Sequence, residues 1–293
     1  MRTKAYKPHK ERPEAELFKK VRAVQLASRK RVDDHLAGEY QSAFRGRGME
    51  FDQVREYDST DDPRHIDWMV TARTGHPFVK TFVEERELSV VFLIDGSGSS
   101  DFGQGAQSRF ELAVEILATL GLSGVRKNDS LGLLVFTSEV ELFIPPRKGR
   151  KHFLRLVREL LAFVPQHRGT DLAQALEFCN QALKRRGISF LISDFLDPKD
   201  FSKPLRHLAK RQDLVCIETG TPPEASLSGL GLLEVTDLEA GRQVTIDTGR
   251  LANSGRDLST YLRAQGADYL QVAEAEELSS QLEAFFRQRR HRR

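Results

Sequence analysis

The 293-residue chain contains only two cysteines, Cys179 and Cys216, which lie far apart and form no CxxC pair. This spacing gives neither a disulfide framework nor a cysteine-based metal site, so we expect two buried, reduced thiols. An excess of one charge is also missing, because the formal net charge is only +3. The average charge therefore does not imply a nucleic-acid partner, and the cysteine usage favours a cytoplasmic location.

Long hydrophobic runs are absent as well. No apolar stretch approaches the roughly 20 residues needed to span a bilayer, and the charged N-terminus lacks the apolar core of a signal peptide. No GxGxxG or P-loop pattern follows a predicted strand, so nucleotide binding by this chain has no support. We expect no membrane span, with any membrane association made through partners.

The stretch around which the chain is organised is LSVVFLIDGSGS at 88–99. Its first seven residues are almost all apolar, which is typical of a strand buried on both faces. The strand ends at Asp95, and the small polar residues that follow predict a loop before a helix that opens near Phe110. In open parallel α/β sheets, ligands bind at this carboxyl edge of the strands.

Asp95, Ser97 and Ser99 place oxygen donors at alternate positions of this loop. Alternate positions of an extended segment point the same way, so one carboxylate and two hydroxyls can converge on one ion. Hard oxygen donors suit Mg²⁺, Mn²⁺ or Ca²⁺ rather than Zn²⁺. The alternative is a serine-rich turn that only caps the next helix, and this stretch alone does not decide between the two.

Two later stretches favour the metal. Thr170 follows a glycine and precedes a helical pattern, and Asp194 ends a second apolar strand. In this order, the five positions resemble the metal-ion-dependent adhesion site of von Willebrand factor A domains. The resemblance implies a Rossmann-like strand order with the site above the sheet. It also implies that Ser97, Ser99 and Thr170 contact the ion directly, while Asp95 and Asp194 hold it directly or through water.

A longer resemblance covers about residues 40–100. GRGMEFDQVREYDSTDDPRHIDW and the following ARTGHPFVKTFVEERELSVVFLIDGSGS are similar to the bacterial family catalogued as domain of unknown function fifty-eight. The similarity extends through GTDLAQAL at 169–176 and ISDFLD at 192–197. That family joins a distinctive N-terminal segment to a von Willebrand factor A-like domain. One departure is Ser100, where many members have methionine, but that position is not a predicted ligand.

The order of elements completes the predicted fold. Strands alternate with helices, which predicts an α/β fold with a mainly parallel sheet and helices on both faces. The predicted strands 130–136 and 140–144 are too close for a helical crossover, so they should form an antiparallel edge. We divide the chain into a basic, partly disordered segment at 1–40, a family-specific segment at 41–86 packed on the main domain, a von Willebrand factor A-like domain at 87–286, and a basic tail at 287–293.

One other cluster of polar residues and one histidine are possible metal ligands. Asp58, Asp61, Asp62, His65 and Asp67 could form a second metal site, but they follow no known ligand spacing and a polar turn is the favoured interpretation. His167 lies near the predicted metal loop and could be a ligand or a proton donor, but an exposed loop histidine is the favoured interpretation.

These observations favour a non-enzymatic, divalent-metal-dependent protein-binding module. The family resemblance implies a partner of the MoxR-type AAA+ ATPase class, and a chaperone-like adaptor role in assembling or maturing a client protein that offers an acidic side chain. The alternative is a metal-dependent hydrolase or phosphotransferase. Aspartyl phosphotransfer usually needs a second carboxylate two residues after the first, where this chain has Ser97, and no nucleophile–base pair is evident.

Overall fold

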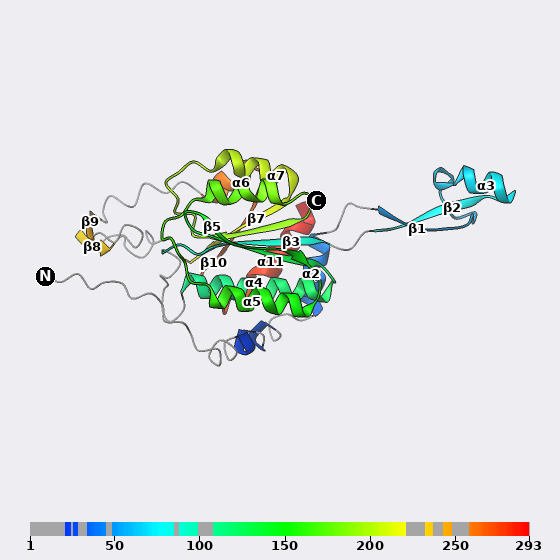
Figure 1. Cartoon of the computed structure of the whole chain (residues 1–293). Helices are drawn as coiled ribbons and strands as arrows, with labels where there is room; N and C mark the ends of the chain where they lie inside the picture. The colour runs from blue at the N-terminus through cyan, green and yellow to red at the C-terminus, as the bar shows by residue number, and fades with distance from the viewer. Residues whose placement is uncertain are drawn as a thin grey trace. The chain divides into compact units, whose positions relative to one another are not determined.

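The computed structural model describes residues 21–24, 26–28, 34–44, 49–84, 88–98, 108–220, 232–236, 243–247 and 258–292. These residues belong to two compact units (Figure 1). Phe44–Glu87 forms the smaller unit, and the chain on either side of it forms the larger. Ser99 and most of the basic segment at 1–40 lie outside the described residues. That 41–86 packs on the main domain stays a prediction.

A six-stranded sheet forms the centre of the larger unit. Its order is β10 (Asp268–Val272), β7 (Asp213–Thr219), β6 (Ile188–Ser193), β3 (Ser89–Asp95), β4 (Ser130–Phe136) and β5 (Val140–Arg147). All neighbours are parallel except β4 and β5, which form the predicted antiparallel edge. Counted along the chain, this is the 3-2-1-4-5-6 order of Rossmann-type sheets. The predicted mainly parallel α/β fold is therefore confirmed.

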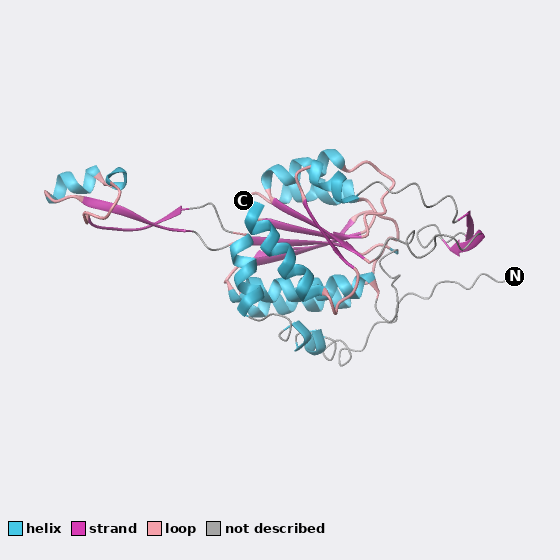
Figure 2. Cartoon of the chain, turned by 180° about the vertical axis from the view of Figure 1, so that it is seen from behind, coloured by secondary structure: helices cyan, strands magenta, loops and turns pink. Residues whose placement is uncertain are grey.

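Helices cover both faces of the sheet, as predicted (Figure 2). One face carries α6 (Leu172–Ala182), α7 (Ser202–Arg211) and α10 (Leu258–Ala264). The other carries α4 (Arg109–Arg126), α5 (Arg150–Ala162), α2 (Asp34–Ala43) and α11 (Leu278–Arg292). Of the helices that the structure describes, none is long and apolar enough to cross a bilayer.

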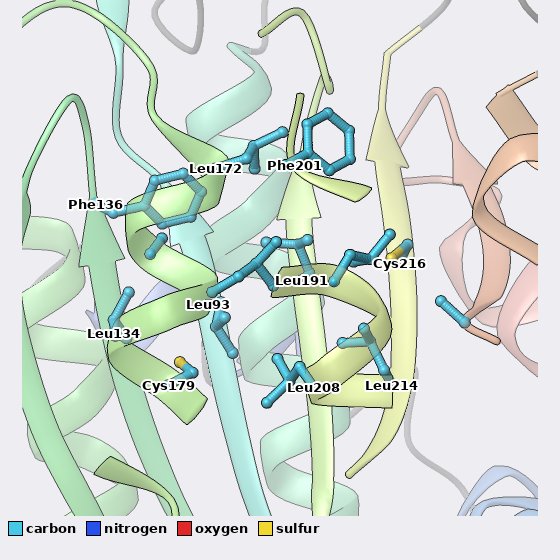
Figure 3. Packing of buried hydrophobic residues seen from close by; sticks show 14 of the residues in the cluster. Leu93, Leu134, Phe136, Leu172, Cys179, Leu191, Phe201, Leu208, Leu214 and Cys216 are labelled. Carbon is cyan, nitrogen blue, oxygen red and sulfur yellow. The ribbon is translucent and has the colours of Figure 1, made fainter. Parts of the chain in front are cut away.

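The central strand β3 is buried on both faces, as its unbroken apolar sequence predicts. Val91 and Leu93 pack in the cluster beneath α6 and α7 (Figure 3). Phe92, which alternates with them, stacks on Phe190 with 5.5 Å between ring centroids. Both cysteines are free and buried within the cluster of Figure 3, in agreement with the predicted reduced thiols.

The edge strand β5 is longer than its sequence suggests. Two consecutive prolines, Pro145 and Pro146, predict its end, but β5 continues through both to Arg147. An edge strand tolerates proline because one side of its backbone has no strand to bond. The register with β4 shifts between Leu131 and Leu133, which accommodates the prolines as an irregularity.

Helices α2 and α11, which lie far apart in the chain, pack against each other on one face of the larger unit. Helix α2 buries Leu36 and Tyr40, and the Tyr40 ring meets Phe286 of α11 edge to face. Helix α11 continues to Arg292, so residues predicted as a basic tail are helical as far as that position. The buried Arg289 explains the difference, because its guanidinium pairs with Asp213 and Asp268 at the starts of β7 and β10.

One buried carboxylate joins the two places where the chain passes between units. Asp129 Oδ2 accepts a hydrogen bond from the Tyr40 hydroxyl, and its Oδ1 accepts one from the backbone N–H of Leu88, both at 3.0 Å. The chain therefore leaves the larger unit after α2 and returns at the start of β3 beside the same side chain.

The smaller unit is an antiparallel hairpin of β1 (Met49–Glu56) and β2 (Phe78–Glu84). Its connection contains the 3-10 turn η1 (Pro63–His65) and the short helix α3 (Trp68–Thr74). The acidic residues of this connection are held by ion pairs and caps, namely Arg55–Asp61 at 2.6 Å, Arg64–Asp62 at 2.7 Å and Lys80–Asp67 at 3.2 Å. Within the described residues, no group of three or more His, Cys, Asp or Glu side chains is placed to hold a metal. The ion pairs and caps are those of a polar turn.

A second hairpin follows β7 in the chain. β8 (Leu232–Thr236) and β9 (Gln243–Asp247) pair antiparallel, as the two short apolar runs predict.

Candidate metal site

The site begins where β3 ends. Asp95 and Ser97 are both almost completely buried. Asp95 Oδ1 accepts the backbone N–H of Ser97 at 3.0 Å, which folds the loop back over the strand end. Asp95 Oδ2 accepts the hydroxyl of Ser193 at 2.7 Å, and Ser193 is the last residue of the neighbouring strand β6. Asp95 therefore links the loops that follow two adjacent parallel strands.

Backbone hydrogen bonds bring a third loop to the same edge. Gly98 N–H donates to the carbonyl of Arg168 at 2.9 Å, and Asp171 N–H donates to the carbonyl of Thr137, just beyond β4, at 3.0 Å. Thr170 lies between Arg168 and Asp171 in the chain and is buried. The loops that carry Asp95, Thr170 and Asp194 are thus connected to one another, although the Thr170 loop joins α5 to α6 and follows no strand. Ser99 lies outside the described residues.

Asp194 sits in a turn with unusual backbone geometry. Its Oδ1 accepts the N–H of Leu196 at 3.1 Å, and its Oδ2 accepts Nη1 of Arg109 at 2.6 Å. Phe195, which lies between Asp194 and Leu196 in the chain, has φ 57°. Residues other than glycine rarely adopt this left-handed conformation. The Phe195 ring stays buried near Phe201, so the strained backbone is offset by packing. As a result Leu196 is 53% exposed directly beside the carboxylate.

Burial and mutual repulsion disfavour the negative charges of the carboxylates at this edge. Burial raises the pKa of Asp95 to about 7, and the nearby negative charge of Asp194 adds to the effect. Hydrogen bonds from Ser193 and Ser97 offset part of this rise. On the next strand, β7, burial likewise raises the pKa of Glu218, whose carboxylate accepts the hydroxyl of Tyr269. Negative charge at this edge is therefore costly unless a cation lies nearby.

The chemistry of the donors suits a hard divalent cation. Asp95 and Asp194 offer carboxylate oxygens, and Ser97 and Thr170 offer hydroxyl oxygens, with no nitrogen or sulfur ligand among the predicted set. Oxygen ligands are those that Mg²⁺, Mn²⁺ and Ca²⁺ prefer. Such an ion would also relieve the repulsion between the two buried carboxylates. The residues present fit the ion, and its binding stays a prediction.

Sequence reasoning missed two residues that hold this edge together. Ser193 precedes Asp194 directly, but its bond to Asp95 spans 98 positions of the chain. Arg109 is the first residue of α4, and its bond to Asp194 spans 85 positions. A helix that follows a parallel strand begins near the carboxyl edge, so the topology placed the start of α4 close to the site. No local pattern indicated which side chain Arg109 would meet.

His167 is an exposed loop residue, as its favoured interpretation has it. Its backbone N–H donates to Glu141 Oε1 at 2.9 Å, and its ring Nδ1 lies 3.3 Å from the same oxygen. Glu141 also accepts the Thr137 hydroxyl at 2.6 Å, so it organises the loop before α6.

Known proteins resemble most of this chain. Residues 53–266 match the family model described as "Protein of unknown function DUF58". "Uncharacterized protein Rv1480" of Mycobacterium tuberculosis is 33% identical over 265 residues, which cover 86% of this chain and 83% of the relative. "Uncharacterized protein MAV169" of Mycobacterium avium is 31% identical over 160 residues, covering 50% of this chain and 94% of that protein.

Two solved structures illustrate the wider similarity. The conserved hypothetical protein BatB from Bacteroides thetaiotaomicron is 14% identical, with a TM-score of 0.49, over 69% of this chain and 98% of BatB. The SpRpn10 VWA domain is 15% identical, with a TM-score of 0.42, over 67% of this chain and 93% of that domain. Nothing about function follows from likenesses this distant. The family model, which matches well over half of the chain, shows that the chain belongs to the DUF58 family.

Proposed function

We propose that this protein is a divalent-metal-dependent protein-binding module whose ion accepts an acidic side chain from a partner. The ligands are Asp95, Ser97, Ser99, Thr170 and Asp194. The observation that supports this role is the joining of three donor-bearing loops, through Asp95–Ser193 and Gly98–Arg168, at the carboxyl edge of the central sheet. Mg²⁺ is the expected ion, with Mn²⁺ or Ca²⁺ as alternatives.

Charge explains the preference for an acidic partner. Mg²⁺ takes six oxygen ligands and keeps several waters in most protein sites. Three of the five proposed ligands are neutral hydroxyls, so they fill coordination positions without cancelling charge. A coordination position that a partner carboxylate can take from water, beside an incompletely neutralised ion, favours Glu or Asp on the partner. Exclusion of water by the surrounding interface would strengthen that bond.

Leu196 supplies an apolar contact beside the ion. It is exposed next to Asp194, and the left-handed turn at Phe195 holds it there. Binding energy at protein interfaces concentrates in a few contacts from which water is excluded. A carboxylate–ion bond flanked by Leu196 would combine charge recognition with apolar burial.

The proposed partners are a MoxR-type AAA+ ATPase and a client protein that offers the acidic side chain. In this setting the chain works as an adaptor in the assembly or maturation of protein complexes. We place it in the cytoplasm, a reducing compartment that suits two free, buried thiols.

Binding is favoured over catalysis at this edge. Ser97 stands where aspartyl phosphotransfer would need a second carboxylate, and its N–H binds Asp95. The ring Nδ1 of His167 lies 3.3 Å from Glu141 Oε1. This contact holds His167 on Glu141 and does not favour it as the base of a nucleophile–base pair.

The proposal is tested by titrating Mg²⁺ or Mn²⁺ into the protein by calorimetry and by capturing a candidate AAA+ partner with and without EDTA. We expect a single weak ion site, and capture that EDTA abolishes and Mg²⁺ restores. Ser97→Ala and Thr170→Ala should lose both effects. Ser280→Ala, which removes an exposed hydroxyl that donates to the carbonyl of Glu277 just before α11, is the matched control. Partner capture that ignores EDTA and both substitutions would refute metal dependence, and Mg²⁺-dependent phosphatase activity would favour the enzyme alternative.

A further inference from the structure

Arg109 forms a buried ion pair at the candidate metal site. Its side chain is 11% exposed and that of Asp194 is 4% exposed, with 2.6 Å between Nη1 and Oδ2. Charged side chains are rarely this buried unless they are paired. The pair joins the first residue of α4 to the loop after β6, so one full positive charge is fixed beside a predicted metal ligand.

The backbone is shaped to receive this arginine. A Cβ atom at Gly220 would lie 3.0 Å from Arg109 Nε and 3.7 Å from both Cδ and Cγ. Gly220 also has φ +88°, which other residues adopt only with strain. The turn at the end of β7 therefore presents bare backbone to the arginine stem, and this fixes where the guanidinium lies.

The carboxylate of Asp194 is engaged on both sides. Oδ2 accepts Arg109, and Oδ1 accepts the N–H of Leu196 at 3.1 Å. An ion that uses Asp194 must share it with the guanidinium, directly or through water. Two positive charges next to one carboxylate repel each other, most strongly where burial limits screening by solvent.

We propose that Arg109 is a built-in counter-ion of the metal site, which stabilises Asp194 when no ion is bound and lowers the affinity of the site for divalent ions. This role rests on the proposed metal dependence. It implies that the ion alone binds weakly and that an acidic side chain from a partner, by adding negative charge, tightens ion binding. Ion and partner therefore bind cooperatively, and the occupied state is reached mainly in the complex.

The test compares Arg109→Met with Arg109→Lys in the full-length protein. Methionine keeps the unbranched stem against Gly220 and removes the charge, whereas lysine keeps the charge. Arg126→Met is the matched control, because Arg126 ends the same helix about 25 Å from Arg109. Mn²⁺ and Mg²⁺ affinities are measured by calorimetry, and melting temperatures are measured with EDTA and with millimolar Mg²⁺.

We expect Arg109→Met to bind Mn²⁺ at least about tenfold more tightly than the unmodified protein. In EDTA its melting temperature should fall by roughly 5 °C or more, because Asp194 is left buried without its cation. Mg²⁺ should recover most of that loss. Arg109→Lys and Arg126→Met should stay close to the unmodified protein in both measurements. Adding Asp95→Ala to Arg109→Met should remove the gain in affinity, which assigns it to this site.

The possible failures are distinguishable. If the unmodified protein and Arg109→Met bind Mn²⁺ with equal affinity, the counter-ion role is overturned and metal binding stands. If neither protein binds any ion, metal dependence is overturned together with the counter-ion role. If Arg109→Met melts lower by the same amount in EDTA and in Mg²⁺, and its affinity is unchanged, the ion pair only fastens α4 to β6. If Arg109→Met binds Mn²⁺ and the unmodified protein does not, the result supports the counter-ion role most strongly.

Discussion

Three buried side chains hold their protons more tightly in the folded chain than in the unfolded one. Burial raises the pKa of Cys179 to about 12 and also raises that of Cys216. Burial, and then the nearby Asp129 carboxylate, raise the pKa of Tyr40 well above its usual value of 10.0. As pH rises, the unfolded chain releases these protons first, so the folded state loses stability in alkaline solution.

Tyr40→Phe isolates the tyrosine part of this effect. The Tyr40 contribution is complete below about pH 10, the ordinary tyrosine pKa, and falls as pH rises above it. The free energy of unfolding of the unmodified protein should therefore decline more steeply between pH 10 and 11 than that of Tyr40→Phe. The slopes should differ by up to about 1.4 kcal/mol per pH unit. Urea denaturation at several pH values measures both slopes.

The substitution also removes the hydrogen bond to Asp129, which shifts the whole curve at neutral pH by about 1 kcal/mol or more. Only the difference in slope reports the proton. Parallel curves for the two proteins above pH 10 would show that the Tyr40 hydroxyl titrates normally in the folded chain.

For single residues, the sequence predicts where the site residues lie in the fold but not which side chains they bond to. Asp95, Thr170 and Asp194 were predictable at one edge because each follows or precedes a regular element whose direction is fixed by a parallel sheet. Arg109 was not, because a long side chain reaches whichever carboxylate the tertiary fold brings near. The left-handed Phe195 was equally hidden, since bulky residues seldom adopt that conformation.

At the scale of elements, Arg289 attaches α11 to the edge of the sheet where β7 and β10 begin. Arg289 is 3% exposed and pairs with Asp213 and Asp268, at the starts of β7 and β10, while its Nε donates to the carbonyl of Ala43 in α2. One guanidinium thus joins two strands and two helices. Its neighbour Arg290 is 46% exposed and only approaches Glu39, at 3.7 Å.

Arg289→Met should lower the free energy of unfolding by about 3 kcal/mol or more, because it leaves two partly buried carboxylates without their cation. Arg290→Met, one position further along the same helix, should lower it by less, since the Arg290 guanidinium is nearly half exposed and lies 3.7 Å from Glu39. Chemical denaturation of the two variants gives both values. A loss for Arg289→Met no larger than that for Arg290→Met would contradict the anchoring role.

Elements with a strong local pattern were predictable, and those defined by distant contacts were less so. The apolar run of β3 indicates a buried strand without further information. The end of β5 was wrongly placed because prolines exclude a central strand and not an edge strand. Helix α2 begins in the region that the sequence predicts to be a basic, partly disordered segment. Its packing on α11 and α4 shows that Leu36 and Tyr40 belong to the core.

For the whole molecule, the smaller unit raises the question of what stabilises it. It is a two-stranded hairpin with a short helix, and such a hairpin is marginally stable alone in water. Trp68 and Met69 are exposed on α3. That 41–86 packs on the main domain stays a prediction.

Limited proteolysis tests that packing. A protease should remove about the first dozen residues, which are basic and poor in apolar side chains, and should spare 49–84. Mass spectrometry of the resistant fragments identifies the cleavage sites. A clean cut between residues 60 and 75 that leaves two stable fragments would show that the hairpin is not protected by the rest of the chain.

The Asp129 junction has a consequence for how this protein can vary. The chain leaves the larger unit after Tyr40 and returns at Leu88, and both residues bond to Asp129. For the larger unit, the intervening segment is therefore a loop whose two ends are held together. The entropic cost of such a loop grows only slowly with its length. The larger unit should therefore tolerate changes in the length or sequence of this intervening segment. The candidate metal site lies at the opposite end of β3, roughly 20 Å away, so we expect it to be unaffected.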